Sequence, residues 1–71
     1  MSTELETGLP SIRTVQETIR QGTQVEILLM TSDRLTGKLR WQDPHCICLI
    51  DAANQSTLIW RQAIAYIKPL T

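Results

Sequence analysis

The chain has 71 residues and a mass of 8.1 kDa, which allows one small domain and excludes a second. Such a short chain buries about 60% of the surface that its unfolded form exposes, so its core is marginal without disulfides, a metal or a partner subunit. Seven basic and seven acidic residues cancel at neutral pH, so no bulk charge draws the chain to DNA or to a membrane. These properties favour a small protein that associates with other copies of itself.

Targeting and membrane signals are missing from the sequence. The longest apolar run, residues 46–50, is far shorter than the ~20 residues of a membrane-spanning helix. Residues 1–4 lack the basic start of a secretory signal, and two cysteines make no disulfide framework. We therefore expect a cytoplasmic location. Residues 1–9 are acidic and aperiodic, which predicts a disordered tail ahead of a single domain at residues 10–71.

A helix is predicted over residues 10–21. Its apolar positions recur with the spacing of one helical face: Ile12, Val15 and Ile19. Pro10 suits the first turn of a helix and Ser11 is a possible cap, although both cannot hold their ideal positions. Gly22 follows where a left-handed residue ends many helices.

Alternating apolar and polar residues after Gly22 predict five short strands joined by tight turns. Their expected ranges are 25–30, 35–42, 46–50, 57–60 and 64–68. Gly37 favours a sharp bend or bulge within the second strand. In strict alternation Trp41 shares the phase of Leu35 and Leu39, which predicts a place in the core or at a subunit interface.

The expected fold class is mainly β with one N-terminal α-helix. Five curled antiparallel strands in about 50 residues are typical of a strongly bent sheet or open barrel of the Sm, SH3-like or OB type. An open barrel leaves edge strands unpaired, and the strand at residues 57–60 carries no charge or proline that would block pairing. Edge-to-edge pairing between copies would close into a ring.

Residue types that carry out catalysis or bind metals are sparse. Cys46 and Cys48 face the same way in a strand with His45 as their neighbour, and no second ligand cluster exists, so we predict buried packing for both. No partner at motif spacing makes His45 a catalytic base. Asp43 before Pro44 predicts a turn fixed by side-chain to backbone hydrogen bonds. We expect no enzyme, no cofactor and no metal site.

The order of elements and several motifs resemble the Hfq family of bacterial Sm-like proteins over residues 9–69. The first Sm motif is similar to residues 25–29, residues 35–39 and Asp43, and the second to residues 59–64, Ile-Trp-Arg-Gln-Ala-Ile. Three stretches resemble the divergent cyanobacterial branch of the family: residues 9–11, 40–44 and 63–66. This resemblance implies an Sm-like homohexameric ring, joined through the fourth and fifth strands, that binds RNA.

The resemblance places a proximal RNA site, for uridine-rich ends, on the helix side of the ring. The family's lysine and histidine correspond to Arg61 and Gln62, and the preceding tyrosine corresponds to Trp60. His45 takes the place of a base-stacking phenylalanine, and Asp43 orients the binding loop. Arg61 keeps a charge that forks onto phosphate, whereas Gln62 loses the stacking surface of histidine. For Trp60, interface packing and a role in the site both stay open.

The family's distal site, for adenine-rich RNA, is altered throughout. The corresponding residues are Leu28, Thr31, Ser32, Asp33 and Thr36. Stacking on an aromatic side chain contributes ~1–3 kcal/mol per base, which Leu28 does not supply, and the Asp33 carboxylate has the wrong sign for phosphate. The family's rim arginines are reduced to Arg20 and Arg13. We expect weakened proximal binding and little distal binding.

Two functions therefore remain, with a third less favoured. The first is an RNA chaperone in post-transcriptional regulation and stress response, with weak sites for U-rich RNA. The second is a ring of the type IV pilus system that docks a protein, such as the pilus extension ATPase, because the cyanobacterial branch is associated with that system. The third is a monomeric SH3-like adaptor. For Lys38 and Arg40 a solvated face is favoured over phosphate contact.

Overall fold

The computed structural model describes residues 8–70, so the predicted tail at residues 1–9 lies mostly outside the described residues. The elements follow one another as α1 (Pro10–Gln21), β1 (Gln24–Leu29), β2 (Arg34–Gln42), β3 (Cys46–Ile50), β4 (Ser56–Trp60), the short 3-10 helix η1 (Arg61–Ala63) and β5 (Ile64–Pro69). This order agrees with the predicted helix and five strands. α1 is too short and too polar to cross a membrane.

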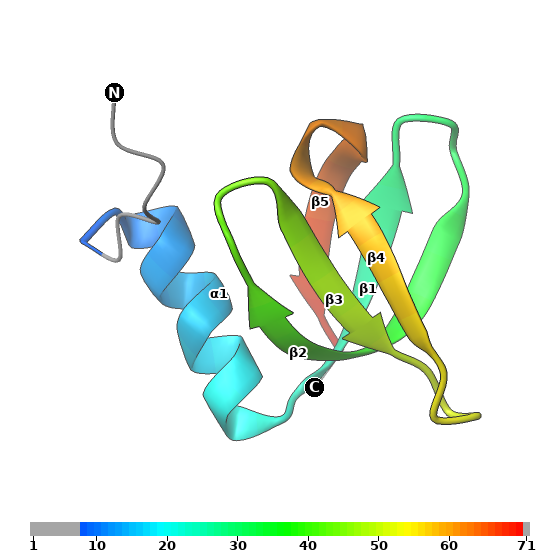
Figure 1. The fold of residues 1–71 in the computed structure, drawn as a ribbon, viewed down its shortest axis with the longest axis horizontal. Helices are drawn as coiled ribbons and strands as arrows, with labels where there is room; N and C mark the ends of the chain where they lie inside the picture. The colour runs from blue at the N-terminus through cyan, green and yellow to red at the C-terminus, as the bar shows by residue number, and fades with distance from the viewer. Residues whose placement is uncertain (1–7, 71) are drawn as a thin grey trace.

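The five strands form one antiparallel sheet in the order β4-β3-β2-β1-β5. The sheet curls strongly, with β4 and β5 as its two edges and α1 alongside β2 (Figure 1). β4 and β5 do not pair with each other in the described chain, so the barrel is open. The predicted fold class is confirmed by this arrangement.

The hydrophobic core lies between α1 and the concave face of the sheet. Its buried members are Val25, Ile27, Leu39, Ile47, Leu49 and Ile59. Val15 and Ile19 pack against this cluster from α1, and Ile12 is buried at the other end of the helix. The predicted helical face is therefore confirmed. Thr18, which the sequence did not single out, is also buried, and its hydroxyl donates to the Thr14 carbonyl at 2.9 Å.

The ends of α1 combine one confirmed prediction with one correction. Gly22 has a φ of 66° and its N–H donates to the carbonyls of Thr18 and Ile19, which is the predicted left-handed end of the helix. At the start, the cap is Leu9, without a side-chain hydrogen bond, and Ser11 does not cap the helix. Proline occupies the first turn because a helix needs no N–H there.

The alternation of β2 changes phase within the strand. Leu39 pairs with Leu49, but Trp41 pairs with Cys48, so Arg40 is an extra residue that forms a bulge. Trp41 therefore faces away from the core and is 40% exposed, so the core was the wrong one of its two predicted places, and a place at a subunit interface stays a prediction. The same change of phase turns Gln42, which pairs with Ile47, toward the core and α1.

Candidate functional site

The turn between β2 and β3 is built around Asp43. Its carboxylate oxygen Oδ1 accepts hydrogen bonds from the backbone N–H groups of His45 at 2.8 Å and Cys46 at 2.7 Å. These two bonds, with smaller contributions from the charges of His45 and Arg61, hold the pKa of Asp43 below its usual range. The predicted role of Asp43 in fixing this turn is confirmed.

η1 lies beside this turn and is held at both of its ends. The Arg61 N–H donates to the His45 carbonyl at 2.8 Å, and the Met30 N–H donates to the Ala63 carbonyl at 2.7 Å. Three connections of the chain therefore meet at one end of the sheet: the turn after β1, the turn after β2 and η1 after β4 (Figure 1).

A hollow of about 340 Å³ opens where the second turn meets η1. Five residues line it: Pro44, His45, Trp60, Arg61 and Gln62. Four of them, His45, Trp60, Arg61 and Gln62, are residues that the sequence assigned to the proximal site. Asp43, the fifth assigned residue, does not line the hollow but holds the turn through its two hydrogen bonds. His45 and Gln62 are exposed, and Trp60 keeps 53% of its surface exposed. The hollow thus combines a cation, an indole, an imidazole and an amide around one opening.

The Arg61 side chain is held in place by two hydrogen bonds. Its Nε donates to the Asp43 backbone carbonyl at 2.9 Å, and its Nη2 donates to the Gln42 side-chain oxygen Oε1. The Gln42 amide nitrogen in turn donates to the Ile12 carbonyl at 3.2 Å and to Gln16 Oε1 at 3.0 Å. Arg61 is therefore connected through one side chain to α1.

The contact of Gln42 with Arg61 and α1 was not predicted from the sequence, because of the bulge that precedes Gln42 in β2. A strict alternation through β2 assigns Gln42 to the outer face, away from the helix. The bulge at Arg40 reverses that assignment. Gly37, two positions before Leu39, was the available signal of an irregular strand, but it gave neither the position nor the phase of the bulge.

The predicted distal residues lie on the outer face of β1 and β2 and in the turn between them. Leu28 pairs with Arg34 on one side and with Tyr66 on the other, and Thr36 pairs with Glu26. In the turn, the Thr31 hydroxyl donates to Asp33 Oδ2 at 2.8 Å, and Ser32 has a φ of 74°.

A carboxylate that the sequence reading did not assign, Glu26, lies on the same outer face. The Tyr66 hydroxyl donates to Glu26 Oε2 at 2.6 Å, and Lys68 Nζ lies 3.8 Å from that oxygen. The hydrogen bond from Tyr66 and the nearby cations lower the pKa of Glu26, and the same bond raises the pKa of Tyr66. Lys68 also lies 5.8 Å from the centre of the Tyr66 ring. The face therefore carries an acidic group beside the Leu28 position.

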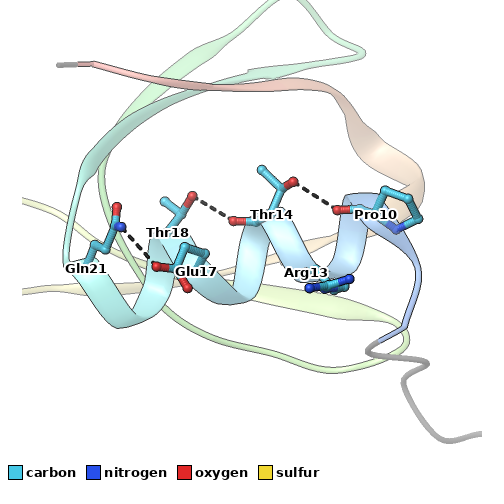
Figure 2. Close-up of a pocket in the computed structure, with 6 residues that line it drawn as sticks. All are labelled: Pro10, Arg13, Thr14, Glu17, Thr18 and Gln21. Atoms are coloured by element: carbon cyan, nitrogen blue, oxygen red, sulfur yellow. Dashed lines mark hydrogen bonds between the residues drawn. The ribbon is translucent and has the colours of Figure 1, made fainter.

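A larger hollow, of about 590 Å³, runs along α1 on its Arg13 side. Figure 2 shows its lining, in which the polar side chains bond within the helix: Thr14 to the Pro10 carbonyl, Thr18 to the Thr14 carbonyl and Gln21 to Glu17. Of the two predicted rim residues, Arg13 lines this hollow, and Arg20 forms an exposed ion pair with Glu17. The side chains of Thr14, Thr18, Glu17 and Gln21 thus have partners within the helix, and the hollow beside η1 is the better candidate site.

Cys46 and Cys48 are both buried and neither forms a disulfide. They lie on the convex side of β3, where Trp60 pairs with Cys46 and both Trp41 and Leu58 pair with Cys48. Burial, and secondarily the Asp43 carboxylate, raises the pKa of the Cys46 thiol. Within residues 8–70, no cluster of three histidine, cysteine or acidic side chains is placed to hold a metal ion.

Comparisons with known proteins agree with this architecture. A model of the family described as Hfq related matches residues 9–69. Among solved structures, the chain is similar to an Hfq protein from Anabaena sp., with 52% sequence identity and a TM-score of 0.80 over 87% of this chain and 98% of that one. A crystal structure of the pleiotropic translational regulator Hfq shares the fold, with 14% identity and a TM-score of 0.83 over 93% and 98% of the two chains. No curated protein matches the chain.

Proposed function

This chain belongs to the Hfq-related family, and we propose that it is a cytoplasmic, ring-forming RNA-binding protein whose main RNA site is the hollow beside η1. One observation carries the proposal. Four residues assigned to an RNA site from the sequence come from two segments of the chain and line one hollow: His45 from the turn after β2, and Trp60, Arg61 and Gln62 from the junction of β4 and η1. The proposed activity is binding without catalysis.

The chemistry of the hollow suits the end of a single RNA strand. The Arg61 guanidinium has five N–H donors, and its two internal bonds leave others for a phosphate oxygen. The exposed Trp60 indole and the His45 ring offer flat surfaces for bases, whose stacking contributes ~1–3 kcal/mol each. Gln62 provides an amide for the polar edge of a base. One such site is small, so repetition around a ring supplies the avidity that it needs.

The two edges of the sheet support the ring. Within residues 8–70, β4 and β5 have no strand beyond them in the sheet, and β4 exposes Leu58 and Trp60. Pairing of β4 with β5 of the next copy uses the free backbone groups of both edges and repeats in one direction until the ring closes. The proposed assembly has six subunits, with six copies of the hollow around its opening.

We propose further that the outer face of β1 and β2 binds adenine-rich RNA poorly. Leu28 gives no aromatic platform, Glu26 lies beside Thr36 on the same face, and Asp33 lies in the turn that joins the two strands. Their negative charge opposes phosphate. The RNA chaperone role in post-transcriptional regulation would therefore use the Arg61 hollow, with uridine-rich RNA as its ligand.

The test combines native mass with titration of U-rich and A-rich oligonucleotides at near-physiological salt. We expect a ring that binds U-rich RNA, and Arg61→Ala should weaken this binding and reduce the salt slope by roughly 0.7 per lost phosphate contact. Lys38→Ala, which removes an equal charge from an exposed part of β2, is the matched control.

Three results would contradict the proposal. Unchanged U-rich affinity in Arg61→Ala would show that the hollow is not the site. A ring that binds neither RNA would instead favour the protein-docking alternative, and a partner retained from native extract after nuclease treatment would identify it. A monomer at nanomolar concentration would contradict the ring itself.

A further inference from the structure

Three hydrogen bonds link the Gln42 side chain to two other segments of the chain, α1 and η1. Its Nε2 donates to the Ile12 carbonyl and to Gln16 Oε1 on α1, and its Oε1 accepts from Arg61 Nη2. An amide with two donor hydrogens and one accepting oxygen in use has a fixed orientation. Gln42 is half-buried between the helix and the sheet, where an amide that lost these partners would be costly.

The Arg61 side chain gains a defined direction from this arrangement. A free arginine samples many rotamers and loses that freedom when it binds a ligand. In this protein Nε is held by the Asp43 carbonyl and Nη2 by Gln42, so the plane of the guanidinium is set before any ligand arrives. Among the described residues, the other N–H donors of the guanidinium remain free for a ligand, and Arg61 lines the hollow beside η1.

We propose that Gln42 is a positioning residue for Arg61, which fixes the guanidinium at the hollow and connects it to α1 through Gln16 and Ile12. This inference rests on the proposed function, because it assigns to Gln42 a part in RNA binding by the same site. Gln42 itself touches no RNA; it acts by reducing the rotamer freedom that Arg61 has to lose on binding. The positive charge of Arg61 at the site is the same with or without Gln42.

The main variant is Gln42→Met, which keeps the length of the side chain and removes its hydrogen-bonding groups. We expect U-rich affinity to fall about three- to tenfold, the cost of ordering one long side chain. The salt slope should stay at the wild-type value, because the Arg61 charge remains, whereas Arg61→Ala should reduce it. Gln55→Met, the same substitution in the exposed loop after β3, is the matched control and should bind as the wild type does.

A double-variant cycle separates positioning from a general structural role. If Gln42 acts through Arg61, Gln42→Met should cost nothing further in an Arg61→Ala background. A loss of equal size in both backgrounds would overturn the inference, and so would wild-type affinity in the single variant. Where Gln42→Met fails to assemble, Gln16→Met takes its place, because it removes one Gln42 partner from the exposed face of α1.

A measurement without RNA distinguishes failure of this inference from failure of the proposed function. In isotopically labelled protein, the Arg61 Nε–H resonance should be protected from solvent exchange in the wild type and in Gln55→Met, and exchange faster in Gln42→Met. Unchanged exchange would overturn the positioning role even if RNA binds. Faster exchange in Gln42→Met, combined with a wild-type ring that does not bind RNA, would keep the positioning of Arg61 by Gln42 and overturn RNA binding as its purpose.

Discussion

The backbone of Gly37 passes so close to Ile50 that a Cβ on Gly37 would lie 2.3 Å from the Ile50 carbonyl oxygen. β2 and β3 curl over each other at this point, where Lys38 pairs with Ile50. A backbone oxygen cannot move aside as a flexible side chain can. The close curl of the sheet therefore requires glycine at this position.

Gly37→Ala should lower the free energy of unfolding by about 1–3 kcal/mol, because the methyl group overpacks against backbone. Chemical denaturation measures the loss. Gly8→Ala is the control, since a Cβ there meets nothing within 4 Å, and it should change stability by less than about 0.5 kcal/mol. Equal stability of the two variants would mean that the strands separate at little cost.

The stability that Asp43 provides should depend on pH. Its pKa is lowered in the folded chain, so its carboxylate stabilises the fold above the pKa of the unfolded state, and that contribution is lost as the pH falls through the folded pKa. Asp43→Asn keeps an accepting oxygen but cannot ionise. We expect the variant to be less stable than wild type at about pH 7 and the difference to shrink below about pH 4.

Urea denaturation across this pH range measures the difference between the two proteins. A difference that stayed constant from neutral to acidic pH would show that the lost charge is not its cause. The loss would then come from hydrogen bonds to the His45 and Cys46 N–H groups that the asparagine amide does not reproduce.

The buried thiols should resist alkylation in the native protein. Burial raises the pKa of Cys46, which lowers the thiolate fraction that reacts, and Cys48 is flanked on its face by Trp41 and Leu58. We expect iodoacetamide to modify neither thiol at neutral pH and both in denaturant. Trp41→Ala should expose Cys48 and make it react in the native state, as peptide mass measurements would reveal. Rapid alkylation of the native wild type would contradict this packing.

Binding of adenine-rich RNA should be gained when the outer face is changed in two ways. Leu28→Tyr supplies a stacking surface, and Glu26→Gln removes the neighbouring carboxylate while an amide oxygen still accepts from Tyr66. We expect A-rich affinity to rise about tenfold or more in the double variant, from stacking of one base per subunit. U-rich affinity serves as the internal control and should not change. No gain with A-rich RNA would mean that the turn at Thr31–Asp33 also excludes it.

Most of the fold could be predicted from the sequence, because its elements show in patterns among residues that are close together in the chain. The helix could be predicted from Ile12, Val15 and Ile19, and the strands from period-two alternation, because each pattern reports a local backbone geometry. The Asp43 turn was predictable for the same reason. Membership of the hollow followed from the family resemblance, which placed Trp60, Arg61 and His45 together before any distance was known.

The remaining features depend on how distant segments meet. The bond between Gln42 and Arg61 requires the change of phase in β2, which strict alternation in the sequence concealed. Thr18 is polar by composition, and only the packing of α1 shows that its hydroxyl bonds within the helix and leaves its methyl group to be buried. Glu26 shares the period of Leu28, so its place on the outer face was visible in the sequence, but its pairing with Tyr66 was not.

The bulge at Arg40 gives β2 one residue more than its ladder with β3 uses. The alternation of the strand accordingly has two phases. Up to Leu39 the odd-numbered side chains face the helix, and beyond the bulge the even-numbered Gln42 does. The extra residue in the strand, and not only the identity of each side chain, thus decides that the Gln42 amide lies under α1 and that the Trp41 indole lies outside. Insertions and deletions in this short segment would exchange those surfaces at once, a change that no single substitution in the strand can make.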